Sequence, residues 1–410
     1  MPLREYMTGP SKNRFPPAWL TAAATWALAV VCIAAQASDV SEKILFSGAD
    51  GRSYFSFRIP ALISFKSRAD GSTVVMAFAE ARKSCGRDAG DIDTVVRVSR
   101  NGGVGWTPRA VIAGRRTAGE PDLGTWGNPT AVYDEVTGRV WLMLNYNAAG
   151  KAQWPCRHIC DAKLARRCQE GKTESPIGVG DRKVFVTFSD NEGRSWAQPR
   201  DISADVQYPG TRWDAVGPGA GIQLQGRCGK GHLLFPAIGR NIYSSDHGKN
   251  WRRSPKLPGG TSEATLVELR DGTLMRNDRA SGHSLVAANR RPVSKSTDCG
   301  KTWTPWHPHA ELPTVRVHGS LIRLDSRPGD VLVFANPAST ERRRNMTIRL
   351  SNDAGKTWPR EREIHAGTAG YPALAEIGGA AIGLLYEKGN SSAKSQGQIA
   401  FFRAPLAWLR

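Results

Sequence analysis

The stretch Ser296-Thr-Asp298-Cys-Gly300-Lys-Thr-Trp303 is one copy of an eight-residue unit from which the architecture can be inferred. The unit carries Ser, Asp or Asn, Gly and Trp at its first, third, fifth and eighth positions. Its five copies begin at Ser99, Ser189, Ser244, Ser296 and Ser351. The Asp or Asn side chain can cap a turn, the Gly permits a positive φ, and the Trp can pin the turn onto an apolar layer. Each copy is therefore predicted to be the turn of a β-hairpin.

The spacing of the copies predicts how these hairpins are organised. From Ser189 onward they begin 55, 52 and 55 residues apart, and segments 184–189 and 346–351 are rich in the β-branched and aromatic residues of strands. About 55 residues is the length of one four-stranded propeller blade. We therefore predict an all-β, six-bladed β-propeller. The first gap, of 90 residues, contains a Cys-rich insertion at about residues 151–180.

The composition and the N-terminus indicate an exported globular protein. The 410 residues include 43 Gly, 25 Pro and 13 Trp and are 40% hydrophobic, which excludes a disordered chain and favours strands and turns over long helices. A basic leader, an apolar run over 20–35 and Ala35-Gln36-Ala37 predict a signal peptide at residues 1–37. An uncleaved membrane anchor is the alternative interpretation. Residues 38–410 are predicted to form one catalytic domain, without a membrane span in the mature protein.

The charge points to an anionic partner. The formal net charge is +19, but no run of Lys and Arg alternates with aromatic residues, and export argues against nucleic acid. An Arg-rich surplus suits bidentate recognition of carboxylates or phosphates. An anionic small molecule or glycan is therefore the expected ligand.

Six cysteines remain after the leader, an even number that suggests disulfides in an oxidising compartment. Three of them, Cys156, Cys160 and Cys168, lie in the insertion together with His158. A zinc site is the alternative, but this spacing matches no standard zinc motif. Disulfides are the prediction, and the sequence does not establish their pairing.

Arg58, in the apolar segment Phe57-Arg58-Ile59-Pro60, is the first candidate site residue, because a buried guanidinium needs an anion. The F-R-I-P motif, followed by the repeated turn units, resembles the exo-α-sialidase (neuraminidase) family, which includes secreted bacterial enzymes and lysosomal relatives. The resemblance covers the whole mature chain. It extends to the segments 127–129, 217–222, 262–272 and 370–371.

The resemblance implies a role for eight residues. Three arginines that bind the substrate carboxylate match Arg58, Arg279 and Arg343, and Arg82 matches a residue that lines the sugar pocket. The general acid matches Asp88, with Asp91 as the rival assignment, and the Tyr nucleophile and its Glu base match Tyr371 and Glu263. Glu387 matches a carboxylate that orients Arg58. If Arg343 lies on a strand, alternation places Arg342 and Arg344 on the opposite face.

A phenol nucleophile has a physical reason in such a site. The anomeric carbon of a sialic acid carries a carboxylate, so a carboxylate nucleophile would be repelled. A neutral Tyr371 can approach and lose its proton to Glu263 as the bond forms. Sialidases are a known exception to the rule of two catalytic carboxylates.

The expected function is that of a retaining exo-α-sialidase that hydrolyses terminal α-linked sialic acids of glycoproteins, glycolipids or oligosaccharides through a covalent tyrosyl intermediate. The alternatives are a trans-sialidase, acting between or within molecules, and an inactive sialoglycan-binding propeller. No metal and no cofactor is expected. We expect a monomer that is periplasmic or secreted rather than lysosomal. The linkage preference, the particular nonulosonic acid and the pH optimum are left open by the sequence.

Overall fold

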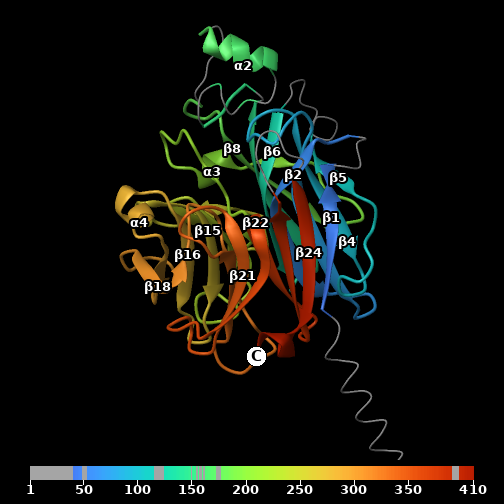
Figure 1. Ribbon diagram of the computed structural model, residues 1–410, viewed down its shortest axis with the longest axis vertical. Helices are drawn as coiled ribbons and strands as arrows, with labels where there is room; N and C mark the ends of the chain where they lie inside the picture. Colours follow the sequence, from blue (N-terminus) through green and yellow to red (C-terminus); the bar gives the residue numbers. More distant parts are fainter. Residues whose placement is uncertain are drawn as a thin grey trace, which may run out of the picture. The chain divides into compact units, whose positions relative to one another are not determined.

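A computed structural model of the chain describes residues 40–48, 53–114, 124–148, 150–153, 156, 159, 162–171, 177–389 and 397–410 (Figure 1). The predicted signal peptide, His158 and Cys160 lie outside these residues. In the described part of the chain the helices are short: α2 (Ala162–Gln169), α3 (Ser203–Val206), α4 (His283–Ala287) and the 3₁₀ helix η2 (Leu406–Leu409). None of the described helices is long and apolar enough to cross a membrane. Nearly all of the remaining regular structure is β-strand.

The described strands form four sheets of seven, nine, four and four strands, and β4 touches β6 in parallel at Ile92 and Thr125. Within these sheets we divide the antiparallel pairs into six successive groups of four strands, counting β22 in two of them. The first two groups are β2 (Ser56–Lys66), β3 (Thr73–Arg82), β4 (Ile92–Ser99) and β5 (Ala110–Ala113), then β6 (Gly124–Asp134), β7 (Arg139–Ala148), β8 (Lys183–Ser189) and β9 (Arg200–Asp201). The next two are β11 (Ile222–Gln223), β12 (Leu233–Ala237), β13 (Arg240–Ser244) and β14 (Arg252–Arg253), then β15 (Thr261–Glu268), β16 (Leu274–Ala280), β17 (Arg290–Ser296) and β18 (His307–Pro313). The last two are β19 (Ser320–Arg323), β20 (Leu332–Pro337), β21 (Arg344–Ser351) and β22 (Arg360–Ile377), then β22, β23 (Ala381–Lys388), β24 (Gln398–Pro405) and β1 (Ser41–Ser47). The short strand β10 (Gly219–Ala220) pairs parallel with β6.

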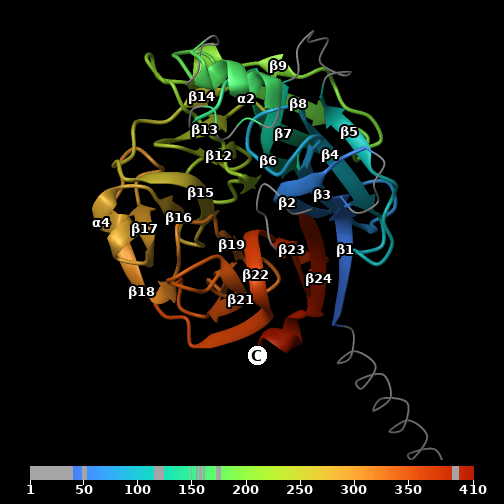
Figure 2. The same cartoon turned by 45° about the horizontal axis from the view of Figure 1, so that its top comes forward.

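Strand β22 belongs to two groups, and strand β1 completes a group from the other end of the described chain. The 18-residue strand β22 pairs with β21 through its first half and with β23 through its second half. Strand β1, the first of the described strands, pairs with β24, the last one, and so completes the sixth group. The first strands of successive groups contact one another in chain order, and β22 contacts β2. Figure 2 shows the groups following one another around a common centre within residues 40–410.

The five repeated units form hairpin turns, as predicted. Each unit begins at the last residue of the third strand of its group, which it joins to the fourth strand. In the unit that begins at Ser296, the Gly300 amide donates to the Ser296 hydroxyl (2.8 Å) and the Thr302 amide donates to an Asp298 carboxylate oxygen (2.9 Å). Gly300 has a φ of 81°, which few other residues adopt. The sixth group has no such turn because its outer strand, β1, comes from the other end of the domain.

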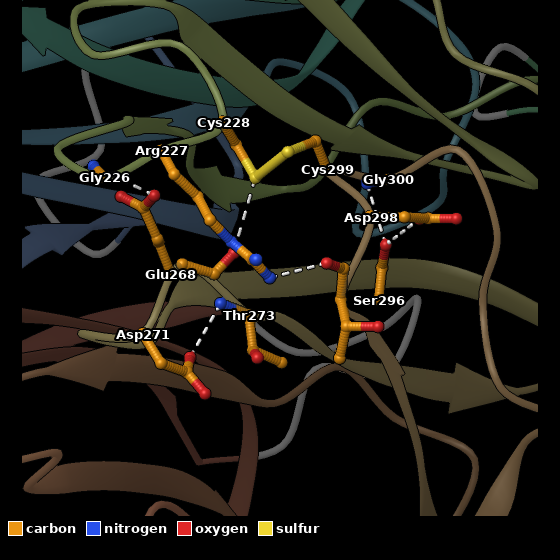
Figure 3. Close-up of a disulfide and its surroundings, with 12 residues drawn as sticks. Gly226, Arg227, Cys228, Glu268, Asp271, Thr273, Ser296, Asp298, Cys299 and Gly300 are labelled. Atoms are coloured by element: carbon orange, nitrogen blue, oxygen red, sulfur yellow. Dashed lines mark hydrogen bonds between the residues drawn. A yellow bond between two sulfur atoms is a disulfide. The ribbon is translucent and has the colours of Figure 1, made fainter.

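The Cys-rich insertion lies between β7 and β8 and includes α2, a helix that the repeat analysis does not predict. A disulfide joins Cys156 to Cys168 within it. A second disulfide joins Cys228, before β12, to Cys299, inside the turn unit after β17 (Figure 3). Cys85 is also disulfide-bonded. The disulfide prediction is thus confirmed for these five cysteines.

Candidate active site

A cavity of about 340 Å³ contains the charged residues singled out in the sequence. Its walls are lined by seven of the eight predicted site residues, Arg58, Arg82, Asp88, Glu263, Arg279, Arg343 and Tyr371. The eighth, Glu387 on β23, is buried behind Arg58. These residues come from four of the six strand groups and from the loops next to them, so the cavity depends on the packing of the groups.

A three-membered hydrogen-bond cluster lies at one wall of the cavity. The Tyr371 hydroxyl donates to Oε1 of Glu263 (2.6 Å). Nη1 of Arg279 donates to Oε2 of Glu263 (2.6 Å) and to the Tyr371 hydroxyl (2.7 Å). Tyr371 is 3% exposed. The cluster therefore joins a phenol, a carboxylate and a guanidinium away from bulk solvent.

Burial and charge act on this cluster in opposite directions. Burial and the charge of Glu263 raise the pKa of Tyr371 above its usual value, although the arginines around it lower it. Burial would also raise the pKa of Glu263, but the charge of Arg279 and the hydrogen bonds to the carboxylate outweigh burial and lower it. At neutral pH the pair is therefore a neutral phenol hydrogen-bonded to an ionised carboxylate, which is the starting state that a general base requires.

Two further arginines flank the Tyr371 ring. The guanidinium carbon of Arg58 lies 5.7 Å from the ring centroid and that of Arg343 lies 5.4 Å from it. Glu387 holds Arg58 through contacts to Nε (3.2 Å) and Nη2 (3.5 Å). Arg343 donates to the Arg316 carbonyl (3.1 Å). Three arginines thus converge on one tyrosine.

The sequence suggested that Arg343 lies on a strand, but the structure places it just before one. Strand β21 begins at Arg344, so Arg343 lies in the bend before the strand and not in the strand itself. Arg344 turns to the side chain of Asn345, to which it donates a hydrogen bond (2.7 Å). The bend, not strand alternation, separates these neighbouring arginines.

Asp88 lies on the loop between β3 and β4, at the cavity mouth. It accepts hydrogen bonds from Nη1 of Arg58 (3.0 Å) and Nη1 of Arg82 (2.9 Å), and its side chain is 52% exposed. The rival Asp91 instead pairs with Lys83 (2.7 Å). The structure therefore brings Asp88, not Asp91, next to the arginines of the cavity.

Local backbone irregularities aim these side chains into the cavity. Strand registers shift between Arg58 and Ala61 in β2, between Thr261 and Ala264 in β15, and between Ala369 and Pro372 in β22. Such bulges redirect side chains and are frequent beside active sites. The first bulge gives Ile59 a φ of 54°, an unfavourable value for a β-branched residue, and Ile59 donates its amide to Glu387 (2.9 Å). The carboxylate that holds Arg58 thus also holds the bulge.

Two glycines leave room for buried carboxylates behind the site. A Cβ atom on Gly370 would lie 1.9 Å from Oε2 of Glu387, and one on Gly127 would lie 2.3 Å from Oε1 of Glu80. The Glu80 carboxylate in turn accepts a hydrogen bond from Nη2 of Arg82 (2.5 Å). A side chain at either position would displace one of these buried carboxylates.

Sequence reasoning missed the wall of the cavity that faces the insertion. Arg182 is buried there, with its guanidinium 4.1 Å from the Trp213 ring centroid, and it donates to Asn128 (2.8 Å) and to Asn147. Burial lowers the pKa of Arg182 to about 10. Glu80 was also missed. The signal available for it was an acid two residues before Arg82 in an otherwise apolar strand.

His318 is a further buried group, next to the nucleophile candidate. Its ring centroid lies 5.6 Å from that of Tyr371, and its side chain is almost fully buried. Burial lowers the pKa of His318 to about 3, with Arg291 and Arg279 acting in the same direction. His318 is therefore neutral across the physiological range.

Comparison with known proteins identifies the family of the chain. A family model described as a BNR repeat-like domain matches residues 72–384. The exo-alpha-sialidase of Aspergillus fumigatus is 31% identical over 379 residues, covering 88% of this chain and 86% of that protein. Among solved structures, the Hadza microbial sialidase Hz136 is 26% identical with a TM-score of 0.71, covering 88% of this chain and 68% of that one. A leech intramolecular trans-sialidase is 20% identical with a TM-score of 0.71, covering 91% and 71%. The fold is thus nearly all-β and of the propeller type, and the chain belongs to the exo-α-sialidase family.

Proposed function

We propose that this protein is a retaining exo-α-sialidase in which Tyr371 is the nucleophile. It is a glycoside hydrolase that acts on terminal α-linked sialic acid. The observation that carries the mechanism is the Tyr371 hydroxyl, which donates to Glu263 at 2.6 Å and accepts from Arg279 at 2.7 Å inside the cavity. Family membership supports the reaction class, and this contact supports the choice of nucleophile.

The substrate carboxylate is bound by Arg58, Arg279 and Arg343. A planar carboxylate accepts paired hydrogen bonds from guanidinium groups, which fixes its orientation as well as its position. Because the carboxylate is attached to the anomeric carbon, its capture above the Tyr371 ring places that carbon next to the phenol oxygen.

In the first chemical step the Tyr371 oxygen attacks the anomeric carbon while its proton moves to Glu263. Asp88, as a carboxylic acid, gives its proton to the glycosidic oxygen, so the bond to the leaving group breaks as the tyrosyl bond forms. The product is a covalent sialyl-Tyr371 intermediate and a released alcohol. General acid and base assistance of this kind contributes about 10²- to 10⁴-fold to the rate.

In the second step Asp88, now a carboxylate, takes a proton from water, and the water oxygen attacks the anomeric carbon. The tyrosyl bond breaks and Tyr371 recovers its proton from Glu263. Two displacements at the same carbon return the original anomeric configuration. Together the two steps consume the sialoside and one water molecule and need no other reactant.

Arg58 links substrate binding to the state of Asp88. In the free protein it donates to Asp88, yet the proposed mechanism needs it on the substrate carboxylate. Glu387 keeps Arg58 in place while it exchanges one anion for the other. Substrate binding therefore removes one of the two arginine hydrogen bonds to Asp88, while the one from Arg82 remains.

The decisive experiment is release of 4-methylumbelliferone from its α-sialoside by the parent protein and by Tyr371→Phe. Turnover in the parent and its collapse in the variant, with unchanged circular dichroism, is the expected result. Mass spectrometry after a fluorinated sialosyl fluoride is added should find the label on the peptide that contains Tyr371. Retained activity in Tyr371→Phe would refute the assignment of the nucleophile.

Trans-sialidation uses the same bond-forming steps with a different acceptor, and the likeness to the leech protein keeps it as the second candidate. The products separate the two. Free sialic acid from sialyllactose indicates hydrolysis, whereas an anhydro sugar or transfer to added lactose indicates trans-sialidation. Binding of sialic acid without any turnover would indicate a sialoglycan-binding protein.

The remaining features follow as parts of the same proposal. The six four-stranded groups form the blades of one propeller spanning residues 38–410, with β1 closing the last blade. The support for this is the contact of β22 with β2 and the chain-order contacts of the other first strands. We propose that residues 1–37 direct export to the periplasm or the medium and that the mature enzyme acts as a monomer.

A further inference from the structure

We infer that the insertion between β7 and β8 forms the leaving-group side of the active site and positions Asp88. The part concerned consists of Lys151, Ala152, Gln153, Cys156, Ile159 and Cys168, which we call the insertion wall. This inference rests on the proposed sialidase function and deepens it, because it assigns a source of leaving-group selectivity. It also gives the Cys156–Cys168 disulfide a role in the reaction.

The insertion wall is attached to the loop that carries Asp88. Ala89, the residue after Asp88, forms a parallel β-bridge with Ile159. Nη1 of Arg87, the residue before it, donates to the Ile159 carbonyl (3.1 Å). Both neighbours of Asp88 in the chain therefore contact the same residue of the insertion.

A small apolar cluster strengthens this attachment. It consists of Ala89, Ala152, Ile159 and Cys168, all of them buried and separate from the large cores of the strand groups. Cys168 belongs both to this cluster and to the disulfide with Cys156. The disulfide therefore fixes the segment that packs against the Asp88 loop.

The other side of the Asp88 loop is anchored to the strands. The Gly90 amide donates to the Thr125 hydroxyl (3.1 Å), and the Gly86 carbonyl accepts from Nη1 of Arg82 (2.6 Å). Asp88 itself keeps a half-exposed side chain at the cavity mouth. A loop held by β-strands on one side and by the insertion on the other has little freedom to carry Asp88 away from the glycosidic oxygen.

The position of the general acid determines where the leaving group lies. Asp88 can protonate the glycosidic oxygen only within hydrogen-bond reach, so the departing alcohol must occupy the space next to Asp88. Lys151, Ala152 and Gln153 line the same cavity there. Lys151 is held in an ion pair with Asp181 (3.0 Å), whereas Gln153 is exposed, so the amide of Gln153 can offer polar groups to the hydroxyls of a sugar leaving group.

Two substrates distinguish a positioning role from a general structural one. An aryl sialoside has a good leaving group that departs with little help from an acid, whereas the sugar leaving group of sialyllactose needs full protonation. Opening the disulfide with Cys156→Ala/Cys168→Ala should lower kcat/KM for sialyllactose by about tenfold or more. The value for 4-methylumbelliferyl sialoside should fall by less than about threefold.

The matched control is Cys228→Ala/Cys299→Ala. It removes the second disulfide for which the structure describes both cysteines, and neither cysteine lines the cavity. In this control variant the ratio of kcat/KM for sialyllactose to kcat/KM for the aryl sialoside should equal the ratio in the parent protein. Arg87→Ala, which removes one contact to Ile159 and no disulfide, should change the ratio in the same direction as Cys156→Ala/Cys168→Ala. This variant tests the inference even if the double variant does not fold.

Gln153→Ala tests the contact with the leaving group directly, and it should raise KM for sialyllactose without raising KM for the aryl substrate. Equal losses on both substrates in the Cys156/Cys168 and Arg87 variants would overturn the inference, as would a changed ratio in the control. Absence of turnover by the parent on either substrate would instead refute the proposed function.

Discussion

The hydroxyl of Tyr371 lies 2.6 Å from a carboxylate oxygen of Glu263, although the two residues are 108 positions apart in the chain. They come from β22 and β15, the first strands of two different groups. Each is placed next to a register shift that turns the strand at that point. The proton transfer that the mechanism needs therefore depends on the relative placement of two strand groups.

The pH dependence of the reaction should reflect the lowered pKa of Glu263. Since the base must be ionised, kcat/KM falls on the acid side as Glu263 takes up a proton. Because the pKa lies below the usual 4.5, the acid limb assigned to Glu263 should also lie below 4.5. The pH profile of kcat/KM checks this. In Glu263→Gln the activity should be about 10²- to 10⁴-fold lower and this limb should disappear, and a limb that persists would contradict the assignment.

Loss of the Glu387 charge should weaken substrate binding more than it slows the chemistry. Glu387→Gln removes an anion that holds Arg58 at 3.2 Å but keeps the side-chain volume. KM should rise by about tenfold, the scale of one charge-assisted hydrogen bond, while kcat changes much less. Glu376→Gln is the matched control, because Glu376 does not line the active-site cavity. Its carboxylate accepts hydrogen bonds from the Asp325 amide and the Ser326 hydroxyl. A fall in kcat at unchanged KM would contradict this role for Glu387.

The Cys228–Cys299 disulfide should contribute stability without affecting the chemistry. It closes a loop with a sequence separation of 71 and joins the third strand group to the fourth, beside a hydrogen bond from Arg227 to the Thr297 carbonyl (2.6 Å) (Figure 3). Restricting the unfolded chain by a loop of this length is worth about 4 kcal/mol. Urea unfolding of Cys228→Ala/Cys299→Ala should show a loss of this order at unchanged kcat. An unchanged midpoint would mean that the unfolded chain is constrained by other means.

The turn units should make the fold sensitive to acid. The pKa values of Asp246, Asp298 and Asp353 are lowered to about 2. The pKa of Asp298 is lowered chiefly by hydrogen bonds from Thr302. For Asp246 and Asp353 burial would raise the pKa, but the hydrogen bonds to the carboxylate outweigh burial and lower it. These carboxylates stabilise the fold above their unfolded pKa near 3.8, and the contribution is lost as the pH falls toward 2.

The variant with all three residues replaced by Asn tests this dependence. Asn occupies the same place in the units that begin at Ser99 and Ser189, so the turns should still form. Thermal unfolding at a series of pH values should show a smaller loss of stability between pH 4 and 2 in the variant than in the parent. Parallel curves for the two proteins would show that the turns do not contribute to the acid sensitivity.

The turns and strands of this protein were predictable from local sequence because their causes are local. A capping Asp or Asn, a Gly with positive φ and a packed Trp lie within eight residues, and β-branched residues precede them. The number of turn units also has a simple explanation once the strand pairing is known. Strand β1 completes the group of β22, β23 and β24, so the position of a sixth turn falls between the two ends of the domain.

The candidate site residues other than Arg58 were accessible from sequence only as matches to a family motif. Arg58 stands out by itself as a charged residue in an apolar segment, but neither Glu263 nor Tyr371 taken singly differs from a residue of the core or of a turn. Their meeting depends on long-range packing of strand groups, on bulges such as that at Ile59, and on the space beside Gly370 that admits Glu387. These features arise from contacts between residues far apart in the chain.

The arrangement of the insertion could not be obtained from the sequence for the same physical reason. Its spacing of cysteines allowed several pairings and a zinc site, because ligand and disulfide partners are chosen by distance in the folded state. The bridge between Ala89 and Ile159 joins two loops whose sequences contain no pairing signal. Local chemistry therefore specified the strands and turns, whereas the cavity, its buried Arg182 and its insertion wall arise only when the groups pack together.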